Sequence, residues 1–294
     1  MSTYKFIVNP AAARGKAARV AEKVKKLCDN RNMDYEFIYT NKSGEATDYA
    51  AKARDNFDCV VAIGGDGTIN EIVNGLIGGR SKLGIIPVGS GNDFARALKI
   101  SLRVTDALDI LLAMKIRSID IGKAGDRYFQ NGLGIGFDAW VVEETLNVNK
   151  LRGKAIYLYS VLKTIYTYNP PEVHIQYNDI IRKEKFYMIT VGNGISLGGG
   201  FKLTPNAILD DAMFDLNIVR NLSKREVYQN LLSVFTGKHI YLEQVTTGRT
   251  DHLKIQSEEG FAAHVDGELI SLHLKSLDIH LIPRALDVVV DHES

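Results

Sequence analysis

The sequence predicts an α/β domain with a parallel sheet, followed by a β-sandwich domain. Up to about Lys123, short apolar strands alternate with amphipathic helices, a pattern typical of βαβ units. From about residue 172 onward short strands dominate, which favours an antiparallel sandwich or barrel. The chain has 294 residues, and one hydrophobic core rarely serves more than about 250. Two domains are therefore expected, over residues 1–123 and 124–284.

The first domain shows strands separated by helices. The run from Cys59 to Ile63 contains no polar residue, as suits a parallel strand covered on both faces. A basic helix carries Val20, Val24, Leu27 and Cys28 on one face. The expected strands are 5–8, 35–39, 59–63 and 83–86, and further helices are expected at about 46–56, at 68–77 and through Ala95.

The second domain reads as strands with a few helices. Helices are expected near 139–147 and 155–168, and a third from Lys224 to about Val234 with Ser223 as its N-cap. The expected strands are 173–177, 186–191, 214–219, 252–256, 262–265 and 279–282. The segment 286–290 is apolar, so we expect it to pack against the rest of the protein.

Composition excludes several classes of function. The chain has 36 basic and 35 acidic residues, a net charge of +1, which argues against nucleic-acid binding through bulk charge. Its two cysteines indicate a reduced cytoplasmic protein rather than a disulfide scaffold. No apolar run approaches the roughly 18–20 residues of a membrane span, so no transmembrane segment is expected. The seven histidines and two cysteines show no ligand spacing, so no zinc site is expected, and His264 and His273 read as ordinary strand residues.

The segment Gly64-Gly65-Asp66-Gly67-Thr68 follows a buried strand and opens a helix. A helix N-terminus offers free N–H groups and a partial positive charge, which favour phosphate. Thr68 and Glu71 also match the capping box Thr-x-x-Glu. The segment is neither a Walker A loop nor the dinucleotide fingerprint Gly-x-Gly-x-x-Gly.

Asp66 is the unusual feature of this loop, because a carboxylate repels phosphate. Two interpretations remain open: Asp66 binds Mg²⁺ or takes a proton from an acceptor, or it only caps a turn. A second glycine turn, Gly89-Ser90-Gly91, follows the fourth strand. The carboxyl ends of parallel strands share one sheet edge, so both turns should meet there, together with Asn9 and Thr40.

These residues resemble the diacylglycerol kinase catalytic-domain family, which also contains sphingosine and ceramide kinases. The bacterial soluble lipid kinases match best. The segments that carry the resemblance are 64–68, 70–71, 74–76, 87–95, 136–139, 198–200 and 266–268. The first of them is shared with NAD kinases and, more loosely, with phosphofructokinases, whereas the segment 87–95 is much more specific to the lipid kinases.

The resemblance implies a Rossmann-like α/β nucleotide-binding domain and a C-terminal β-sandwich domain, with ATP in the cleft between them. It also implies that residues 285–294 return to the first domain. The ATP-binding residues implied by motif match are Asn9, Thr40, Gly64, Gly65, Asp66, Gly67, Thr68, Ile69, Asn70 and Ser90.

For catalysis, the resemblance implies Glu268 as general base, with Asp266 in reserve and Asp66 organising phosphate and metal. From the residues alone, Asp266-Gly267 is equally well a solvated hairpin turn. The resemblance further implies a structural Mg²⁺ held by the Asp211 carboxylate and the carbonyls of Ile208 and Met213. Without it, Asp211 reads as part of an acidic surface loop.

Three positions depart from the family's pattern. Ala212 stands where an Asp-Gly pair is common, so the turn geometry there is in doubt. The turn Ala11–Gly15 lacks a frequent Ser-Gly pair, so Arg14 replaces a hydroxyl contact to phosphate or that contact is lost. Ser90 replaces a threonine, which is a conservative change.

The leading hypothesis is an ATP- and Mg²⁺-dependent kinase that phosphorylates the hydroxyl of a diacylglycerol-like lipid. The alternatives are a NAD kinase and a catalytically silent lipid- or nucleotide-binding regulator. We expect a cytoplasmic protein that contacts the membrane surface through one of two basic groups, Lys16, Arg19, Lys23, Lys25 and Lys26 or Lys150, Arg152 and Lys154. An exposed edge of the sandwich permits a homodimer. The sequence does not identify the lipid.

Overall fold

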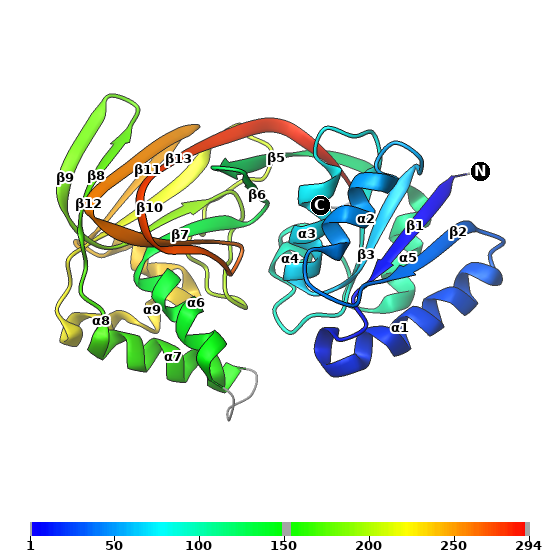
Figure 1. Ribbon diagram of the computed structural model, residues 1–294, viewed down its shortest axis with the longest axis horizontal. Coiled ribbons are helices and arrows are strands. Elements are labelled where there is room, and N and C mark those ends of the chain that lie inside the picture. The colour runs from blue at the N-terminus through cyan, green and yellow to red at the C-terminus, as the bar shows by residue number, and fades with distance from the viewer. Residues whose placement is uncertain (1, 149–153, 292–294) are drawn as a thin grey trace. The chain divides into compact units, whose positions relative to one another are not determined.

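The computed structural model describes residues 2–148 and 154–291, and it divides the chain into two compact units. Unit 1 comprises residues 1–121 and 283–294, and unit 2 comprises residues 122–282. The chain passes between the units along two strands, β5 (Ile116–Ala124) and β13 (Glu268–Val289) (Figure 1).

Unit 1 is built on a parallel sheet in the order β4-β3-β1-β2. Its strands are β1 (Thr3–Val8), β2 (Asp34–Tyr39), β3 (Cys59–Gly64) and β4 (Lys82–Pro87). Every residue of β3 is buried, as its apolar run predicts. The end of β13 pairs in parallel with β4, so the apolar segment 286–290 packs into unit 1.

Helices alternate with these strands, which confirms the α/β class of the first domain. They are α1 (Ala12–Asp29), α2 (Glu45–Ala53), α3 (Asp66–Leu76), α4 (Asp93–Ala97) and α5 (Val104–Ala113). Helix α1 buries Val20, Val24 and Cys28, three of its four predicted apolar positions, whereas Leu27 is half-buried. The sequence analysis did not predict α5.

The loops that follow the four strands meet at one edge of the sheet, as expected. The Asn9 N–H donates to the Ile63 carbonyl (3.1 Å), the Thr40 N–H to the Val8 carbonyl (2.9 Å) and the Val88 N–H to the Gly64 carbonyl (2.8 Å). Each loop is therefore tied to the end of a neighbouring strand.

Unit 2 is antiparallel, which confirms the second part of the predicted fold class. Its strands are β6 (Arg127–Phe129), β7 (Gly132–Gly136), β8 (Glu172–Tyr177), β9 (Ile180–Gly192), β10 (Phe214–Arg220), β11 (Val245–Thr250), β12 (His252–Val265) and most of β13. The segments 252–256 and 262–265, predicted as two strands, form one strand, β12, with register shifts between Gln256 and His264.

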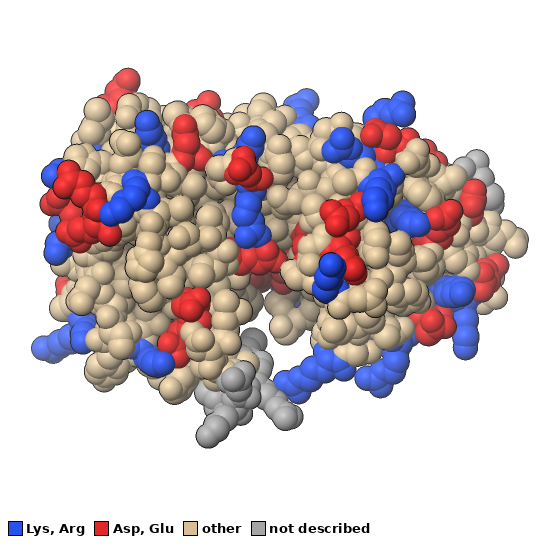
Figure 2. Space-filling model, viewed as in Figure 1, with Lys and Arg blue, Asp and Glu red and all other residues tan. Residues whose placement is uncertain are grey.

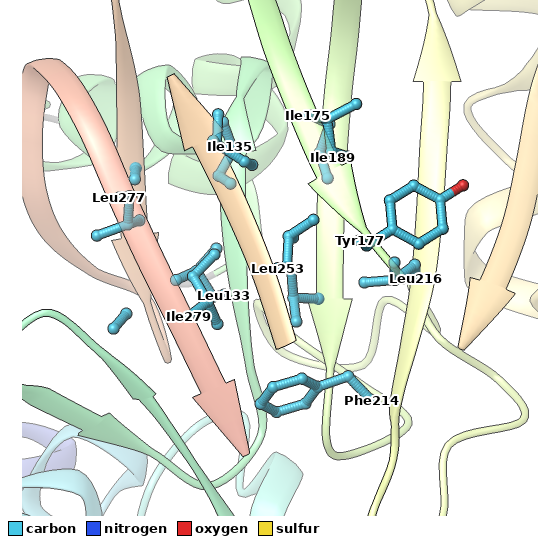
Figure 3. Packing of buried hydrophobic residues seen from close by; sticks show 14 of the residues in the cluster. Leu133, Ile135, Ile175, Tyr177, Ile189, Phe214, Leu216, Leu253, Leu277 and Ile279 are labelled. Carbon is cyan, nitrogen blue, oxygen red and sulfur yellow. The ribbon is translucent and has the colours of Figure 1, made fainter. Parts of the chain in front are cut away.

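The strands of unit 2 enclose a core of aliphatic and aromatic side chains. Leu133, Ile189, Phe214, Leu253 and Ile279 point into it from five different strands (Figure 3). All five are at most 1% exposed. This core fixes the direction of every second residue along β12 and β13, so the side chains between them face outward.

Helices cover part of unit 2. They are α6 (Phe137–Asn147), α7 (Lys154–Thr167), α8 (Lys224–Asn230), α9 (Ser233–Thr236) and the 3-10 helix η1 (Lys238–Tyr241). Ser223 caps α8 as predicted, in a capping box with Glu226. The helix ends at Asn230, short of the predicted Val234, and α9 follows as a separate turn.

Candidate active site

The first glycine loop holds Asn9, Gly64 and Thr68 together in unit 1. A Cβ on Gly64 would lie 2.5 Å from the Thr68 Oγ1, so only glycine fits there. The Asn9 Nδ2 donates to the Thr68 Oγ1 at 3.1 Å. The Asn9 Oδ1 accepts the Ala11 N–H at 3.2 Å, which fixes the amide of Asn9 between both loops.

The predicted capping box at Thr68 and Glu71 is wrong. Helix α3 begins at Asp66 with Gly65 as N-cap, and no side-chain hydrogen bond caps it. Glu71 instead accepts hydrogen bonds from the Ala46 N–H and the Ser43 hydroxyl, both at 3.2 Å, at the start of α2. Its carboxylate therefore joins α2 to α3, and the first N–H groups of α3 lack a side-chain cap from the described residues. A helix end of this kind suits an anionic group.

Asp66 ties the first glycine loop to the second. Its carboxylate accepts the N–H groups of Asn92 (2.8 Å) and Phe94 (3.4 Å). Burial raises the pKa of the Asp66 carboxyl, although these backbone hydrogen bonds act in the opposite direction. Asp66 thus caps the turn before α4, and its described contacts are made with backbone.

The second glycine turn approaches the first at van der Waals distance. A Cβ on Gly89 would lie 2.8 Å from the Gly65 Cα and 2.7 Å from the Asn92 Oδ1. The Asn92 side chain closes the turn, because its Oδ1 accepts the Gly89 N–H (2.7 Å) and its Nδ2 donates to the Gly89 carbonyl (2.9 Å). Asn92 itself has a φ of +53°, a conformation that asparagine tolerates well.

The other predicted ATP-binding residues differ in their exposure and in the contacts of their side chains. Ser90 is exposed at the tip of the second turn. Thr40 is buried, and its hydroxyl contacts the Val8 carbonyl at 3.3 Å. Ile69 and Asn70 are buried as well, and the Asn70 Oδ1 accepts a hydrogen bond from the Asn74 Nδ2 at 3.2 Å. Because the Ile69 side chain is fully enclosed, only its backbone can serve a ligand.

Residues 13–15, after Asn9, form an unusual turn that the sequence analysis did not predict. Ala13, Arg14 and Gly15 have φ values of +47°, +59° and +82°, so three successive residues are left-handed. For Ala13 and Arg14 this conformation is strained, and strained backbone gathers at ligand sites. The departure from the family's pattern noted above falls on these residues.

In unit 2, the Asp-Gly-Glu segment is a hairpin turn between β12 and β13. Val265 pairs with Glu268, and Asp266 and Gly267 between them have φ values of +48° and +85°. The Asp266 carboxylate accepts three backbone N–H groups, from Gln130 (3.0 Å), Asn131 (3.0 Å) and Gly132 (2.9 Å). Asp266 therefore anchors the turn to the start of β7.

Glu268, in contrast, is paired with another side chain. Its side chain is 36% exposed and forms an ion pair with Arg127 on β6. Arg127 is itself 34% exposed, so the pair is partly solvated. The structure thus separates the two acids: the described contacts of the Asp266 carboxylate are with backbone N–H groups, whereas Glu268 contacts the guanidinium of Arg127.

Sequence reasoning missed a buried pair beneath this turn. The Gly267 N–H donates to the His264 Nδ1 at 3.2 Å, and the His264 Nε2 lies 3.4 Å from the Asp138 Oδ2. Because Nδ1 accepts this hydrogen bond, a ring proton would lie on Nε2, the nitrogen nearer Asp138. Glycine at position 134 leaves room for both side chains, since a Cβ there would lie 1.9 Å from the carboxylate. The sequence contained one signal for this pair, because Asp138 lies in the segment 136–139 that carries part of the family resemblance.

The segment expected to hold Mg²⁺ is a turn before β10. The Asp211 Oδ1 accepts the Met213 N–H at 3.2 Å, and Ala212 has the φ of +61° that glycine favours. Arg249 forms an ion pair with Asp211 and lies 3.7 Å from the Asp215 Oδ2. Burial raises the pKa of the Asp215 carboxyl, against the effect of Arg249. The oxygen donors fit Mg²⁺, but Arg249 now compensates their charge. The Ile208 side chain is half-exposed.

Unit 2 also contains an apolar pocket behind the helices. Its walls come from α6, α7, α8, α9, η1, the edge of β9 and β10, and neighbouring loops, with Val161, Leu203, Val219, Val227, Leu231 and Val234 among them. Asp138 and His239 are the titratable polar residues of the lining besides Tyr157 and Tyr187. Burial lowers the pKa of His239, so this imidazole stays neutral. Such a pocket suits a hydrocarbon chain with one polar end.

Two family models match the chain. The diacylglycerol kinase catalytic domain matches residues 3–124, and the YegS C-terminal NAD kinase beta sandwich-like domain matches residues 132–290. Among the described residues, no helix is long and apolar enough to cross a membrane.

Curated relatives and a solved structure agree with these matches. A diacylglycerol kinase of Bacillus subtilis (strain 168) is 33% identical, over 91% of this chain and 90% of the relative. A diacylglycerol kinase of Staphylococcus aureus (strain MRSA252) is 29% identical, over 98% of this chain and 94% of the relative. The crystal structure of a diacylglycerol kinase from Bacillus anthracis str. Sterne superposes with a TM-score of 0.80 at 26% identity and covers 99% of this chain and 98% of that one. This chain therefore belongs to the diacylglycerol kinase family of ATP-using, lipid-kinase-like proteins, with a catalytic domain followed by a YegS-type sandwich domain.

Proposed function

We propose that this protein transfers the γ-phosphoryl group of ATP to the hydroxyl of a diacylglycerol-like lipid. The observation that carries the proposal is the apolar pocket of unit 2, which Asp138 lines. Asp138 lies 3.4 Å from His264, which accepts the N–H of Gly267, next to Glu268. A pocket that accepts a hydrocarbon chain is thus connected by two side chains to the turn that carries the acid.

In the proposed reaction, the lipid hydroxyl oxygen attacks the γ-phosphorus and the bond from that phosphorus to the β–γ bridging oxygen breaks. Glu268 takes the hydroxyl proton, and ADP leaves with the electrons of the broken bond. The glycine loops of unit 1 hold the phosphates through backbone N–H groups, most of all those at the start of α3. Asp66 keeps the two loops together.

We also propose Mg²⁺ as cofactor, in two places. Bound with ATP, it would neutralise negative charge on the transferred group. In unit 2, Asp211 would hold a second, structural ion with carbonyl oxygens of residues 208 and 213, and Arg249 must then leave Asp211. Arg249 is 47% exposed, so its side chain has room to move into solvent.

A lipid kinase must reach its substrate in a membrane, and the helices of unit 2 form a surface that could contact the bilayer. The large apolar side chains exposed on α7, α8, α9, η1 and the loops joining them are Leu158, Tyr159, Leu162, Tyr166, Tyr228, Leu232, Phe235 and Tyr241. In Figure 2, uncharged residues cover most of unit 2 where Figure 1 draws α7 and α8. The same helices line the pocket. We propose that a bilayer surface covers these side chains, since aromatic residues with nearby lysines are typical of membrane interfaces.

This surface differs from the two basic groups expected from the sequence. The five basic residues of α1 are all exposed but belong to unit 1. In the second group, Lys150 and Arg152 lie outside the described residues, and so does the side chain of Lys154. We therefore place the main contact on the apolar helices of unit 2 and give the basic groups a supporting part.

The first test is transfer of label from γ-labelled ATP, with Mg²⁺, to lipids in mixed micelles. The panel contains diacylglycerol, monoacylglycerol, ceramide, sphingosine, phosphatidylglycerol and undecaprenol, with NAD as soluble control. We expect label in diacylglycerol or a lipid of similar shape. Label in NAD alone would establish a NAD kinase, and ATP binding without transfer to any acceptor would support a silent regulator.

Glu268→Gln tests the proposed base. We expect turnover to fall at least about 100-fold, the usual range for loss of a general base, while the dissociation constant for ATP stays unchanged. Glu259→Gln, an exposed acid on β12, is the matched control and should keep full activity. Wild-type turnover of Glu268→Gln would remove Glu268 from the mechanism.

Vesicle sedimentation tests the membrane surface. The double variant Leu232→Ser with Tyr241→Ser removes the two most exposed apolar side chains of these helices and loops, at 75% and 82%. We expect binding to anionic vesicles to weaken about tenfold or more, because each buried apolar side chain contributes about 1.5–3 kcal/mol. Lys23→Glu with Lys26→Glu, on α1, should have a smaller effect. A larger loss of vesicle binding in the lysine variant than in the Leu232→Ser, Tyr241→Ser variant would assign the membrane contact to α1.

A further inference from the structure

A cluster of two histidines and one aspartate lies on the outer face of unit 2, where β12 pairs with β13. His252 and His280 are direct cross-strand neighbours, and Asp278 precedes His280 by two residues. Side chains of residues two apart point to the same face of a strand, so all three project outward together. Their spacing in the chain shows no metal motif, and only the strand pairing brings them together.

The three ligand atoms converge on one point. The His252 Nε2 is 2.6 Å from the Asp278 Oδ1, and the His280 Nε2 is 3.3 Å from the same oxygen. All three ligand atoms lie within 4.8 Å of one another. The imidazole rings are stacked in parallel, with centroids 4.3 Å apart and planes 4° apart. Both rings place Nε2 near the Asp278 Oδ1.

The framework beneath the cluster is rigid. Leu253 and Ile279, the strand neighbours of His252 and His280, point the other way into the core and are completely buried. The backbone of Asp278 is held on its second edge as well, because its carbonyl accepts the Gly125 N–H at 3.3 Å. The ligands therefore need side-chain rotation only, not movement of the strands, to surround an ion.

We propose that His252, Asp278 and His280 bind a transition-metal dication of the zinc class. Two imidazole nitrogens and one carboxylate oxygen form a donor set that zinc uses, and water completes the tetrahedron at this exposed position. Zinc bonds of about 2.0–2.2 Å bring neighbouring ligand atoms to roughly 3.4 Å from one another. The His280–Asp278 separation of 3.3 Å matches this value, and the His252–Asp278 separation of 2.6 Å must widen when an ion enters. Mg²⁺ prefers oxygen ligands alone, so this site is distinct from any site for Mg²⁺.

The metal takes the place of protons that now join the three side chains. In the metal-free cluster, Asp278 accepts a hydrogen bond from each imidazole that carries a proton on Nε2. Zinc binds the unprotonated nitrogen, so each of these protons must leave when the ion enters. The bound ion would link β12 to β13, the strand that continues into unit 1.

Calorimetric titration with Zn²⁺ tests the site in the whole chain, after removal of metal with a chelator and with excess Mg²⁺ present. We expect one Zn²⁺ per chain. His280→Gln and Asp278→Asn should each weaken its affinity at least about tenfold, since even the loss of an indirect metal contact has effects of that size. His174→Gln, an exposed histidine on the neighbouring strand β8, should bind zinc as the wild type does.

Two further readouts distinguish loss of a specific metal site from general destabilisation of the variants. Co²⁺ should give the visible absorption of a tetrahedral complex in the wild type and lose it in His280→Gln. Zinc should raise the melting temperature of the wild type but not that of either ligand variant, because only a bound ion stabilises the folded chain. Absence of stoichiometric zinc binding would overturn the proposal, as would equal affinity in the wild type and both ligand variants.

Discussion

Two acidic turns of the molecule hold their loops in different ways. In unit 1, the glycine turns at Gly65 and Gly89 touch because neither residue has a side chain, and Asp66 adds two described backbone contacts across them. In unit 2, the turn at Asp266 is held mainly by one carboxylate that accepts three backbone N–H groups at 2.9–3.0 Å.

The difference teaches what an aspartate in a functional motif does. Both Asp66 and Asp266 were candidates for chemistry, and both carboxylates are directed at the backbone of another segment. Unit 1 relies on close approach of main chain, which a methyl group disrupts. Unit 2 relies on a single charge, whose removal leaves several donors unpaired.

The largest effect is expected for Asp266→Asn. Asparagine tolerates the φ of +48° at this position, so the turn itself is kept. One of the two acceptor oxygens is lost, and the new amide faces N–H groups that it cannot pair with. We expect the free energy of unfolding to fall by about 3 kcal/mol or more, because each unpaired buried donor costs about 1–3 kcal/mol. Urea unfolding followed by circular dichroism measures this. Asp126→Asn, at an exposed position nearby, should change little.

Gly89→Ala should have an intermediate effect on stability but a large effect on the affinity for ATP. The added Cβ would lie 2.8 Å from the Gly65 Cα, so one loop must move. Overpacking of this kind costs typically about 1–3 kcal/mol. We expect ATP affinity, measured by calorimetry, to fall about tenfold or more. Gly248→Ala serves as control, because its Cβ would come no closer than 3.4 Å, to the Tyr177 ring. Unchanged ATP affinity in Gly89→Ala would separate the glycine contact from the nucleotide site.

The smallest effect is expected for Asp66→Asn, and it depends on pH. Burial raises the pKa of Asp66 in the folded protein above its unfolded value of 3.8. Its contribution to stability is therefore complete below the unfolded pKa and is lost as the pH rises through the folded pKa. Between about pH 4 and about pH 7, the stability of Asp66→Asn relative to the wild type should improve. Urea titrations of both proteins across this range measure it, and a constant difference would contradict the burial of charge.

The fold was largely predictable because its signals are local. The apolar run of β3 and the alternation of strands and helices are properties of neighbouring residues, and both appear in the structure. Helix α5 was missed although Ala107, Leu108 and Leu111 form a buried face. The separate strands expected over 252–256 and 262–265 are joined in β12, because its register shifts hide the continuity from a simple alternation of residues.

The site was predictable as far as its motifs extend along the chain. Asn9, Thr40 and both glycine turns were predicted to lie at one sheet edge, and the hydrogen bonds between those loops confirm it. Partners distant in the chain were not accessible in this way. Glu71 was assigned to a cap on α3, but it contacts α2, and the pairing of His264 with Asp138 spans more than a hundred residues. Such contacts depend on tertiary structure, which no local pattern encodes.

The end of β13 has a consequence for the order of assembly during synthesis. Val288, Val289 and Val290 are buried in unit 1, and Val288 pairs with Leu83 on β4. The ribosome makes these residues only after all of unit 2. Strand β4 at the edge of the unit 1 sheet therefore lacks its β13 partner until the end of the chain has been synthesised. A nascent chain therefore has its glycine loops long before it has a finished core beneath them. Unit 1, although first in the sequence, is the last to be completed.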